Sequence, residues 1–268
     1  MILFPNAKIN LGLRILRKRE DGFHDIESIM IPVPIYDILE LTASDEFSYH
    51  QTGTHIPSNG SLGLVENAYR LMKERFGIGA LSIHLHKQIP IGAGLGGGSS
   101  DAAFTLKGLN DWFDMGLSTE TLENLATELG SDCPFFINNQ PVLATGRGEL
   151  LQPVNINLHG LYIAIYNPGI HISTASAYGA IIPNPLNCIG RQIKPLNEWQ
   201  AYYINDFELP VTISHPEISL GIQYLLDQGA FYAAMSGSGS SYLGIFENPP
   251  KSLITKDLLY AGACVLSH

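Results

Sequence analysis

Residues 90–103 read Pro-Ile-Gly-Ala-Gly-Leu-Gly-Gly-Gly-Ser-Ser-Asp-Ala-Ala, a run that places five glycines within seven residues. Glycine at this density serves the backbone, because it adopts positive φ and lets a ligand approach the main chain closely. Ser99 and Ser100 stand where the N-cap of a following helix is expected. A glycine-rich turn that leads into a helix presents free N–H groups and the positive end of the helix dipole to one space. We therefore expect residues 90–100, the glycine-rich segment, to bind a polyphosphate.

The spacing within this segment argues against two common phosphate-binding motifs. No Gly-Lys-Ser or Gly-Lys-Thr closes it, as a P-loop requires. The glycines at its start also miss the spacing of a dinucleotide fingerprint. The alternative is a flexible loop, but flexible linkers are not flanked by Lys-Gln-Ile-Pro at residues 87–90 and by a strong helix pattern.

Composition limits the number of domains, the kinds of partner and the compartment to be expected. A chain of 268 residues with 45% hydrophobic and 15% charged residues predicts one large packed domain or two smaller ones. The net charge of −10 argues against nucleic acid as a partner. No apolar run reaches the length of a membrane span, and the first residues lack the layout of a signal peptide. The three cysteines, Cys133, Cys188 and Cys264, are widely spaced and show no metal-binding pattern, so we expect reduced thiols and a cytoplasmic protein.

Alternating helices and strands are expected along the chain from hydrophobic periodicity and from capping residues. The predicted strands lie at residues 2–16, 26–41, 81–85, 161–166, 231–235, 242–246 and 261–266. The predicted helices lie at residues 66–76, 100–112 and 119–129, and between Pro216 and Gly229. Gly77 is expected just past the first helix, Ser118 as the N-cap of the third, and Gly130 as its end. Loops are expected at residues 50–63 and 183–200, and a domain boundary between residues 145 and 160.

Three other segments carry polar side chains that are candidates for a functional site. Lys8 and Asn10 alternate with apolar residues, which predicts a strand that presents an ammonium and an amide side by side. Asp132 stands between a helix end and an apolar run; taken alone, it favours a capping role over catalysis. Residues 236–241, Ser-Gly-Ser-Gly-Ser-Ser, form either a plain hairpin turn or a second backbone cradle.

The order of four segments resembles the GHMP kinases over nearly the whole chain. These segments are residues 7–11, 90–103, 130–136 and 236–241. With Asp-Gly-Phe-His at residues 21–24, the sequence is similar to members whose substrate has a cytidine diphosphate head and a methylerythritol tail. The resemblance implies an α+β fold of two domains with the active site in the cleft between them. Residues 1–150 would form the nucleotide-binding N-terminal domain and residues 151–268 the C-terminal domain.

The resemblance also implies a reaction: ATP with Mg²⁺ would phosphorylate the 2-hydroxyl of the methylerythritol tail, in the non-mevalonate pathway to isoprenoid precursors. Lys8 and Asp132 match the catalytic pair. Asp132 would accept the hydroxyl proton, and Lys8 would keep the carboxylate ionised and stabilise developing charge. Asn10 would orient the acceptor. The residues expected to hold ATP are Pro90, Gly92, Gly94, Leu95, Gly96, Gly97, Gly98, Ser99 and Ser100.

The cytosine site follows from the resemblance by position. His24 would hydrogen-bond the edge of the base, and Phe23 and Tyr178 would enclose it by stacking. Thr174 would lie near the acceptor tail. Gly63 stands where the family usually has an asparagine beside adenine, so backbone contacts are expected to contribute more there. His84 and His86 share one strand face and are interpreted as surface residues, with no metal ligand assigned.

Two other interpretations remain open from the sequence. One is a GHMP kinase for another small alcohol, such as homoserine or mevalonate, which would need no cytosine sandwich. The other is a non-catalytic ligand sensor, which would be expected to lose the base or the lysine. No nucleic-acid or membrane partner is expected, and the chain is expected to be a monomer or a weak homodimer.

Overall fold

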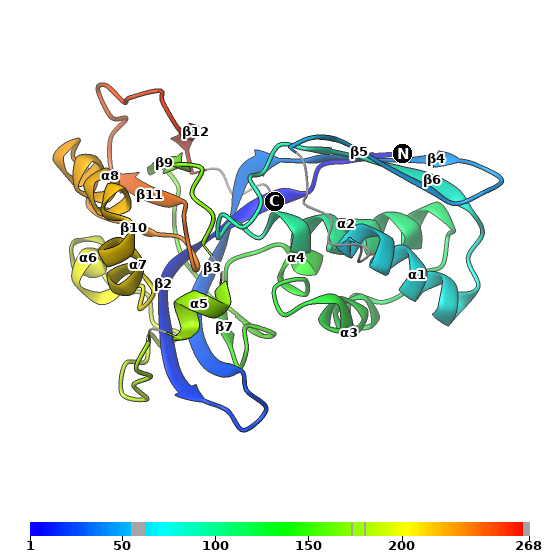
Figure 1. Ribbon diagram of the computed structural model, residues 1–268, viewed down its shortest axis with the longest axis horizontal. Helices are drawn as coiled ribbons and strands as arrows, with labels where there is room; N and C mark the ends of the chain where they lie inside the picture. The colour runs from blue at the N-terminus through cyan, green and yellow to red at the C-terminus, as the bar shows by residue number, and fades with distance from the viewer. Residues whose placement is uncertain (55–62, 173, 180, 265–268) are drawn as a thin grey trace. The chain divides into compact units, whose positions relative to one another are not determined.

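The structure is a computed structural model that describes residues 1–54, 63–172, 174–179 and 181–264 (Figure 1). It contains two compact units, and neither is a continuous stretch of chain. Unit 1 comprises Met1–Ala7, Pro34–Ile91 and Gly96–Gln140, and unit 2 comprises Lys8–Val33, Gly92–Leu95 and Pro141–His268. The chain therefore passes from one unit to the other after residues 7, 33 and 140, and twice within the glycine-rich segment, after residues 91 and 95. The expected domains at residues 1–150 and 151–268 stay a prediction.

Unit 1 is a four-stranded sheet with helices on one side of it. The strand order is β1-β4-β6-β5, with β5 parallel to β6 and the other pairs antiparallel. The elements are β1 (Ile2–Leu3), β4 (Ile38–Ala43), β5 (Ser48–Gly53), α1 (Leu64–Phe76), β6 (Leu81–Lys87), α2 (Gly97–Trp112), α3 (Thr119–Leu129) and α4 (Phe135–Asn138). Figure 1 shows α1, α2 and α3 together on one side of this sheet.

The alternation of β6 explains how this sheet packs. Leu81, Ile83 and Leu85 are fully buried, whereas His84 and His86 on the opposite face are partly exposed. On the buried side α2 comes very close to the sheet at Gly108, where a Cβ atom would lie 2.5 Å from Leu3 Cδ1. The side chains of β6 thus set which face carries the helices.

Most helix ends in unit 1 confirm the predictions. Helix α1 ends at Gly77, which has a φ of +67°, and the Ser118 hydroxyl accepts a hydrogen bond from Thr121 N at the start of α3. The expectation that a serine caps α2 is wrong: the N-cap is Gly96, with a φ of +71°, and the serines lie inside the first turn. The helix begins earlier because glycine reaches the left-handed conformation that the incoming turn needs.

The loop expected at residues 50–63 is partly wrong. Residues 48–53 form β5, which pairs in parallel with β6, and residues 55–62 lie outside the described part of the chain. The polar composition of β5 led to the prediction of a loop, because a partly exposed edge strand needs few apolar residues.

Unit 2 is built around two four-stranded sheets. One has the order β2-β3-β7-β8 and the other β10-β11-β9-β12. Their strands are β2 (Asn6–Lys18), β3 (His24–Tyr36), β7 (Val142–Thr145), β8 (Leu150–Pro153), β9 (Tyr162–Tyr166), β10 (Tyr232–Met235), β11 (Tyr242–Phe246) and β12 (Leu258–Ala263). Its helices are α5 (Thr174–Gly179), the 3₁₀ helix η1 (Leu196–Glu198), α6 (Trp199–Tyr202), α7 (Glu208–Ser214) and α8 (Pro216–Asp227). The first two residues of β2 and the last three residues of β3 belong to unit 1.

The core of unit 2 lies where α8 packs on β10 and β11. Ile218, Ile222 and Leu225 form the buried stripe of α8, and they join a cluster that includes Met235 and Phe246. The predicted bracketing of this helix by a proline and a following glycine is confirmed. The last strand begins earlier than predicted, at residue 258, and residues 265–268 lie outside the described part.

Among the described residues, none of the helices combines the length and the apolar character needed to cross a membrane.

Candidate functional site

Lys8 and Asn10 lie side by side on β2, buried within unit 2, as the alternation of the sequence predicts. Lys8 Nζ donates to Asn10 Oδ1 at 2.5 Å and to the carbonyl of Gly94 at 3.3 Å. Asn10 Nδ2 in turn donates to Ser28 Oγ at 2.7 Å, and Lys8 N donates to the carbonyl of Leu95 at 2.9 Å. The ammonium is therefore fixed against the inner part of the glycine-rich segment.

The serine-rich turn at residues 236–241 supports the same part of the segment. It joins β10 to β11, and Ser236 Oγ donates to the Gly94 carbonyl at 3.0 Å. Ser241 N donates to the carbonyl of Ala93 at 3.1 Å. Gly94 has a φ of +76°, and a Cβ atom there would lie 2.0 Å from the carbonyl oxygen of Ser236. The turn is thus both a hairpin connection and a brace for the glycine-rich segment, and only glycine fits at position 94.

The outgoing half of the segment forms the start of α2 in unit 1. No side chain caps this helix, and the first N–H groups of a helix have no intrahelical acceptor. The positive end of the dipole is also at this turn. Ser100 is fully buried, and its hydroxyl has no hydrogen-bond partner among the described residues. These features suit an anion such as a nucleotide phosphate.

Asp132 lies in the turn between α3 and α4, half-buried in unit 1. The N-cap residue of α4 is Pro134, which makes no side-chain cap. The neighbouring Cys133 is buried, and this burial raises the pKa of its thiol to about 12. The thiol is therefore protonated at neutral pH.

The residues expected at the cytosine site lie in unit 2 and are only partly in contact. The rings of His24 and Tyr178 stack, with centroids 4.7 Å apart and planes 18° apart. Burial lowers the pKa of His24, and the charge of Lys18 lowers it further. Phe23 is 53% exposed, and the ring that stacks on Tyr178 is that of His24. Thr174 is the first residue of α5. A base between Phe23 and Tyr178 stays a prediction.

One residue at this site was missed by the sequence analysis. The guanidinium of Arg147 lies over the ring of Phe23, 5.0 Å from its centroid, and comes from the turn between β7 and β8. The signal in the sequence is slight: Arg147 is flanked by two glycines, which marks a turn but not its neighbour.

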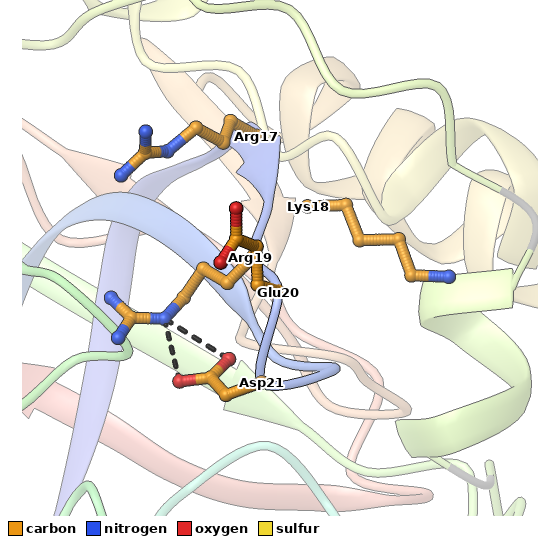
Figure 2. Close-up of a pocket in the computed structure, with 5 residues that line it drawn as sticks. All are labelled: Arg17, Lys18, Arg19, Glu20 and Asp21. Carbon is orange, nitrogen blue, oxygen red and sulfur yellow. Dashed lines mark hydrogen bonds and ion pairs between the residues drawn. The ribbon is translucent and has the colours of Figure 1, made fainter.

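The turn that carries Phe23 and His24 is held by charged side chains. Arg19 Nε donates to both carboxylate oxygens of Asp21, at 3.2 and 3.0 Å, as Figure 2 shows. Another Arg19 nitrogen donates to Asp25 at 2.8 Å, and Arg17 Nε donates to the same carboxylate at 2.6 Å. Arg17 and Arg19 are thus both paired with carboxylates of the same turn.

Residues 17–21 line a surface pocket of about 430 Å³. In Figure 2, Arg17 and Arg19 extend to one side of this pocket and Lys18 to the other. Lys18 makes no ion pair with the described residues, so its charge is available at the pocket and contributes to the low pKa of His24.

Comparison with known proteins identifies the family. Residues 63–140 match the GHMP kinases N-terminal domain, and residues 187–256 match the GHMP kinases C-terminal domain. The chain therefore belongs to the GHMP kinases, and it is an ATP-dependent small-molecule kinase with an α+β fold.

Individual relatives show which members of this family the chain resembles in sequence and in structure. The chain is 46% identical to a 4-diphosphocytidyl-2-C-methyl-D-erythritol kinase from Cytophaga hutchinsonii, over 94% of each sequence. A solved structure of a 4-(cytidine 5'-diphospho)-2C-methyl-D-erythritol kinase has a TM-score of 0.76 and 32% identity, covering 93% of this chain and 91% of that one. A homoserine kinase structure from the same Cytophaga species has a TM-score of 0.65 but only 17% identity, covering 92% and 85% of the two chains, so it shows the fold alone.

Proposed function

We propose that this kinase transfers the γ-phosphate of ATP to the 2-hydroxyl of 4-diphosphocytidyl-2-C-methyl-D-erythritol, a step toward isoprenoid precursors. The names of relatives more than 40% identical over nearly the full length support this acceptor. The observation in this chain that carries the proposal is the stacked pair of His24 and Tyr178, beside a turn that presents Phe23. Homoserine and mevalonate have no base, so they give such a group of rings nothing to bind.

The phosphate side of the reaction is assigned to the glycine-rich segment. The residues of this segment from Gly94 to Ser100 would hold the β- and γ-phosphates through backbone N–H groups. The left-handed glycines and the uncapped start of α2 fit this role. Mg²⁺ would accompany ATP and neutralise part of the phosphate charge.

Asp132 and Lys8 are assigned to the acceptor hydroxyl. Phosphoryl transfer depends on alignment and on charge stabilisation more than on covalent chemistry. The Asp132 carboxylate would accept the hydroxyl proton, while the Lys8 ammonium would stabilise the charge that develops on oxygen. Asn10, whose amide is fixed by Ser28, would orient the acceptor, with Thr174 near its tail.

The cytosine end is assigned to the 17–25 turn and α5. His24 would read the edge of the base, and Phe23 and Tyr178 would stack on its faces. The Arg147 guanidinium, which already covers the Phe23 ring, would add positive charge next to a diphosphate head.

A transfer assay tests the acceptor. Labelled ATP is supplied with each of three alcohols in turn: 4-diphosphocytidyl-2-C-methyl-D-erythritol, homoserine and mevalonate. We expect label only in the cytidyl product. Label in homoserine or mevalonate alone would contradict the proposal, and no transfer to any of the three would favour the non-catalytic ligand sensor.

Asp132→Asn tests the catalytic assignment, because it keeps the shape of the side chain and removes the base. We expect kcat to fall by about two to four decades, the range for loss of a positioned general base, with little change in the KM for ATP. Asp45→Asn, an exposed carboxylate of the same unit, is the control and should not change kcat. Lys8→Met is expected to lower kcat in the same direction. Near-normal turnover of Asp132→Asn would remove Asp132 from the mechanism.

A further inference from the structure

A buried ion cluster lies beneath the glycine-rich segment, within unit 1. Lys87, the last residue of β6, donates to Asp37 Oδ2 and, at 2.7 Å, to Asp101 Oδ2. The three side chains are at most 2% exposed. No role in the proposed reaction has been assigned to any of them, and we call them the Lys87 cluster.

The cluster joins the two ends of the segment. Lys87 stands just before it and Asp101 just after it, fourteen positions apart. Asp37 Oδ1 accepts hydrogen bonds from the backbone N–H groups of Gln88 and Ile89, at 2.5 and 2.8 Å, which are the residues that lead into the segment. One pair of carboxylates therefore fixes both the incoming strand and the outgoing helix to one ammonium.

Gly97, the first residue of α2, rests directly on this cluster. A Cβ atom there would lie 2.8 Å from Lys87 Nζ and 2.8 Å from Ile89 Cγ2. The helix that offers its N–H groups to a phosphate is thus seated on the ammonium itself. A side chain at position 97 would lift the helix start from its support.

Stability alone is a poor explanation for this arrangement. Removing charges from water costs several kcal/mol per ion, and apolar side chains of similar volume often replace a buried ion pair without loss. Directional hydrogen bonds between the two ends do what apolar contacts cannot, which is to fix their separation and angle. A preformed loop loses less conformational freedom when a ligand binds, and this raises affinity.

We propose that Lys87 and Asp101 are positioning residues that hold the two ends of the glycine-rich segment in the geometry that binds the ATP phosphates. The inference rests on the phosphate site assigned under the proposed function. It adds the residues that shape this site without touching the nucleotide.

The two carboxylates differ in a way that supplies a clean test. Asp37 accepts three donors, whereas Asp101 accepts from Lys87 through Oδ2 and interacts with Asp37, and its Oδ1 has no partner among the described residues. Asp101→Ala therefore cuts the link between the ends while the Lys87–Asp37 pair stays balanced in charge. Asp101→Asn removes the charge but keeps an oxygen that can accept from Lys87. Asp111→Ala, at the exposed end of the same helix, is the matched control.

The experiment uses the full chain and measures four quantities: equilibrium binding of a non-hydrolysable ATP analogue with Mg²⁺, the KM for ATP, the KM for the cytidyl acceptor, and unfolding in urea. For Asp101→Ala we expect about tenfold weaker binding of the analogue and a matching rise in the KM for ATP, equivalent to ~1.4 kcal/mol of lost preorganisation. The KM for the acceptor should stay within about twofold of the wild type. Asp101→Asn should recover most of the affinity, and Asp111→Ala should show none of these changes.

Two outcomes would overturn the inference: unchanged analogue binding in a folded Asp101→Ala, or an equal loss of both substrates that follows the loss of stability. Failure of the proposed acceptor is recognised separately. If the wild type ignores the cytidyl alcohol while Asp101→Ala still weakens analogue binding and Asp101→Asn restores it, the positioning role stands and the acceptor assignment fails.

Discussion

The Lys87 cluster in unit 1 and the 17–25 turn in unit 2 use the same chemistry at opposite degrees of burial. In the first, Lys87 and its two carboxylates are at most 2% exposed. In the second, the side chain of Arg17 is 70% exposed and that of Arg19 is 33% exposed (Figure 2). A charge pair interacts strongly where water is excluded and weakly where it is not, because water and salt screen it.

The two regions therefore hold their neighbouring ligand sites in different ways. Around Lys87, losing the ammonium leaves carboxylates in a place where nothing else can solvate them, so the geometry is fixed. Around Arg19, water can replace any lost partner, so the turn that carries Phe23 and His24 can adjust. This predicts a rigid phosphate site and an adaptable base site, and the following variants test the contrast.

Lys87→Met should have the largest effect, because it leaves two carboxylates buried without a cation. We expect the free energy of unfolding to fall by about 3–5 kcal/mol, the range for breaking a buried pair. Urea denaturation measures it, with Arg17→Met as the exposed control, which should unfold like the wild type. Equal losses from the two variants would show that burial does not separate the regions.

The pH dependence of stability should distinguish the buried carboxyl. Burial raises the pKa of Asp101 from an ordinary value of 3.8 to about 7, although the Lys87 ammonium acts in the opposite direction. A group whose pKa is raised by folding contributes stability that is complete below its ordinary value and is lost as pH rises through the folded value. The wild type should therefore lose stability between about pH 4 and about pH 7, by more than Asp101→Asn, which has no carboxyl to titrate.

Urea melts of both proteins at about pH 5 and about pH 8 measure this difference. In the 17–25 turn the pH dependence of stability has the opposite sign, because the hydrogen bond from Arg19 and then that from Arg17 lower the pKa of Asp25. Its smaller contribution is lost as the pH falls. Parallel pH profiles for the wild type and Asp101→Asn would show that folding does not raise the pKa of Asp101.

Tyr178→Ala should weaken binding of the cytidyl acceptor and spare ATP. A stacked base is worth about 1–3 kcal/mol, so we expect the KM for the acceptor to rise by about one to two decades. His24→Ala should reduce the preference for cytidine over uridine heads, because a hydrogen-bonding edge would lose its partner. If these variants impair ATP instead, the two nucleotide sites have been assigned in reverse.

Arg19→Gln should have the smallest effect. It removes the ion pairs with Asp21 and Asp25, but both lie near the surface, and we expect no measurable change in urea unfolding. The KM for the acceptor should rise about two- to fivefold as the turn loosens, and the KM for ATP should not change. A loss of stability as large as that of Lys87→Met would mean that this turn is as rigid as the phosphate site.

Much of the local structure could be predicted, because short-range rules control it. Gly77 ends α1 because it takes a left-handed conformation, and Ser118 caps α3 because its hydroxyl reaches a nearby N–H group. Lys8 and Asn10 lie side by side because alternate residues of a strand share a face. The density of glycines likewise indicated that backbone conformation dominates residues 90–100.

Around the candidate site, contacts between residues close in the sequence were predictable, and contacts with distant partners were not. Ser236 reaches Gly94 across 142 positions, and Arg147 covers Phe23 from another turn. No periodicity indicates either contact. The serine cap expected for α2 failed for a related reason: the path of the incoming turn fixes where the helix begins, and that path depends on the brace beneath Gly94.

The amino-acid order was sufficient for the class of protein and for most helix ends, and it supplied the candidates for the proposed chemistry. These depend on φ preferences, on periodicity and on motifs a few residues long. Burial had to come from the folded chain. In the sequence, Lys87, Asp37 and Asp101 are scattered and look like ordinary surface charges. Arg17 and Arg19 instead belong to a run of three basic residues, which is the more conspicuous cluster of charge. Folding encloses the first set and leaves the second in water, and the surrounding dielectric, set by contacts between distant segments, determines how strongly each set interacts.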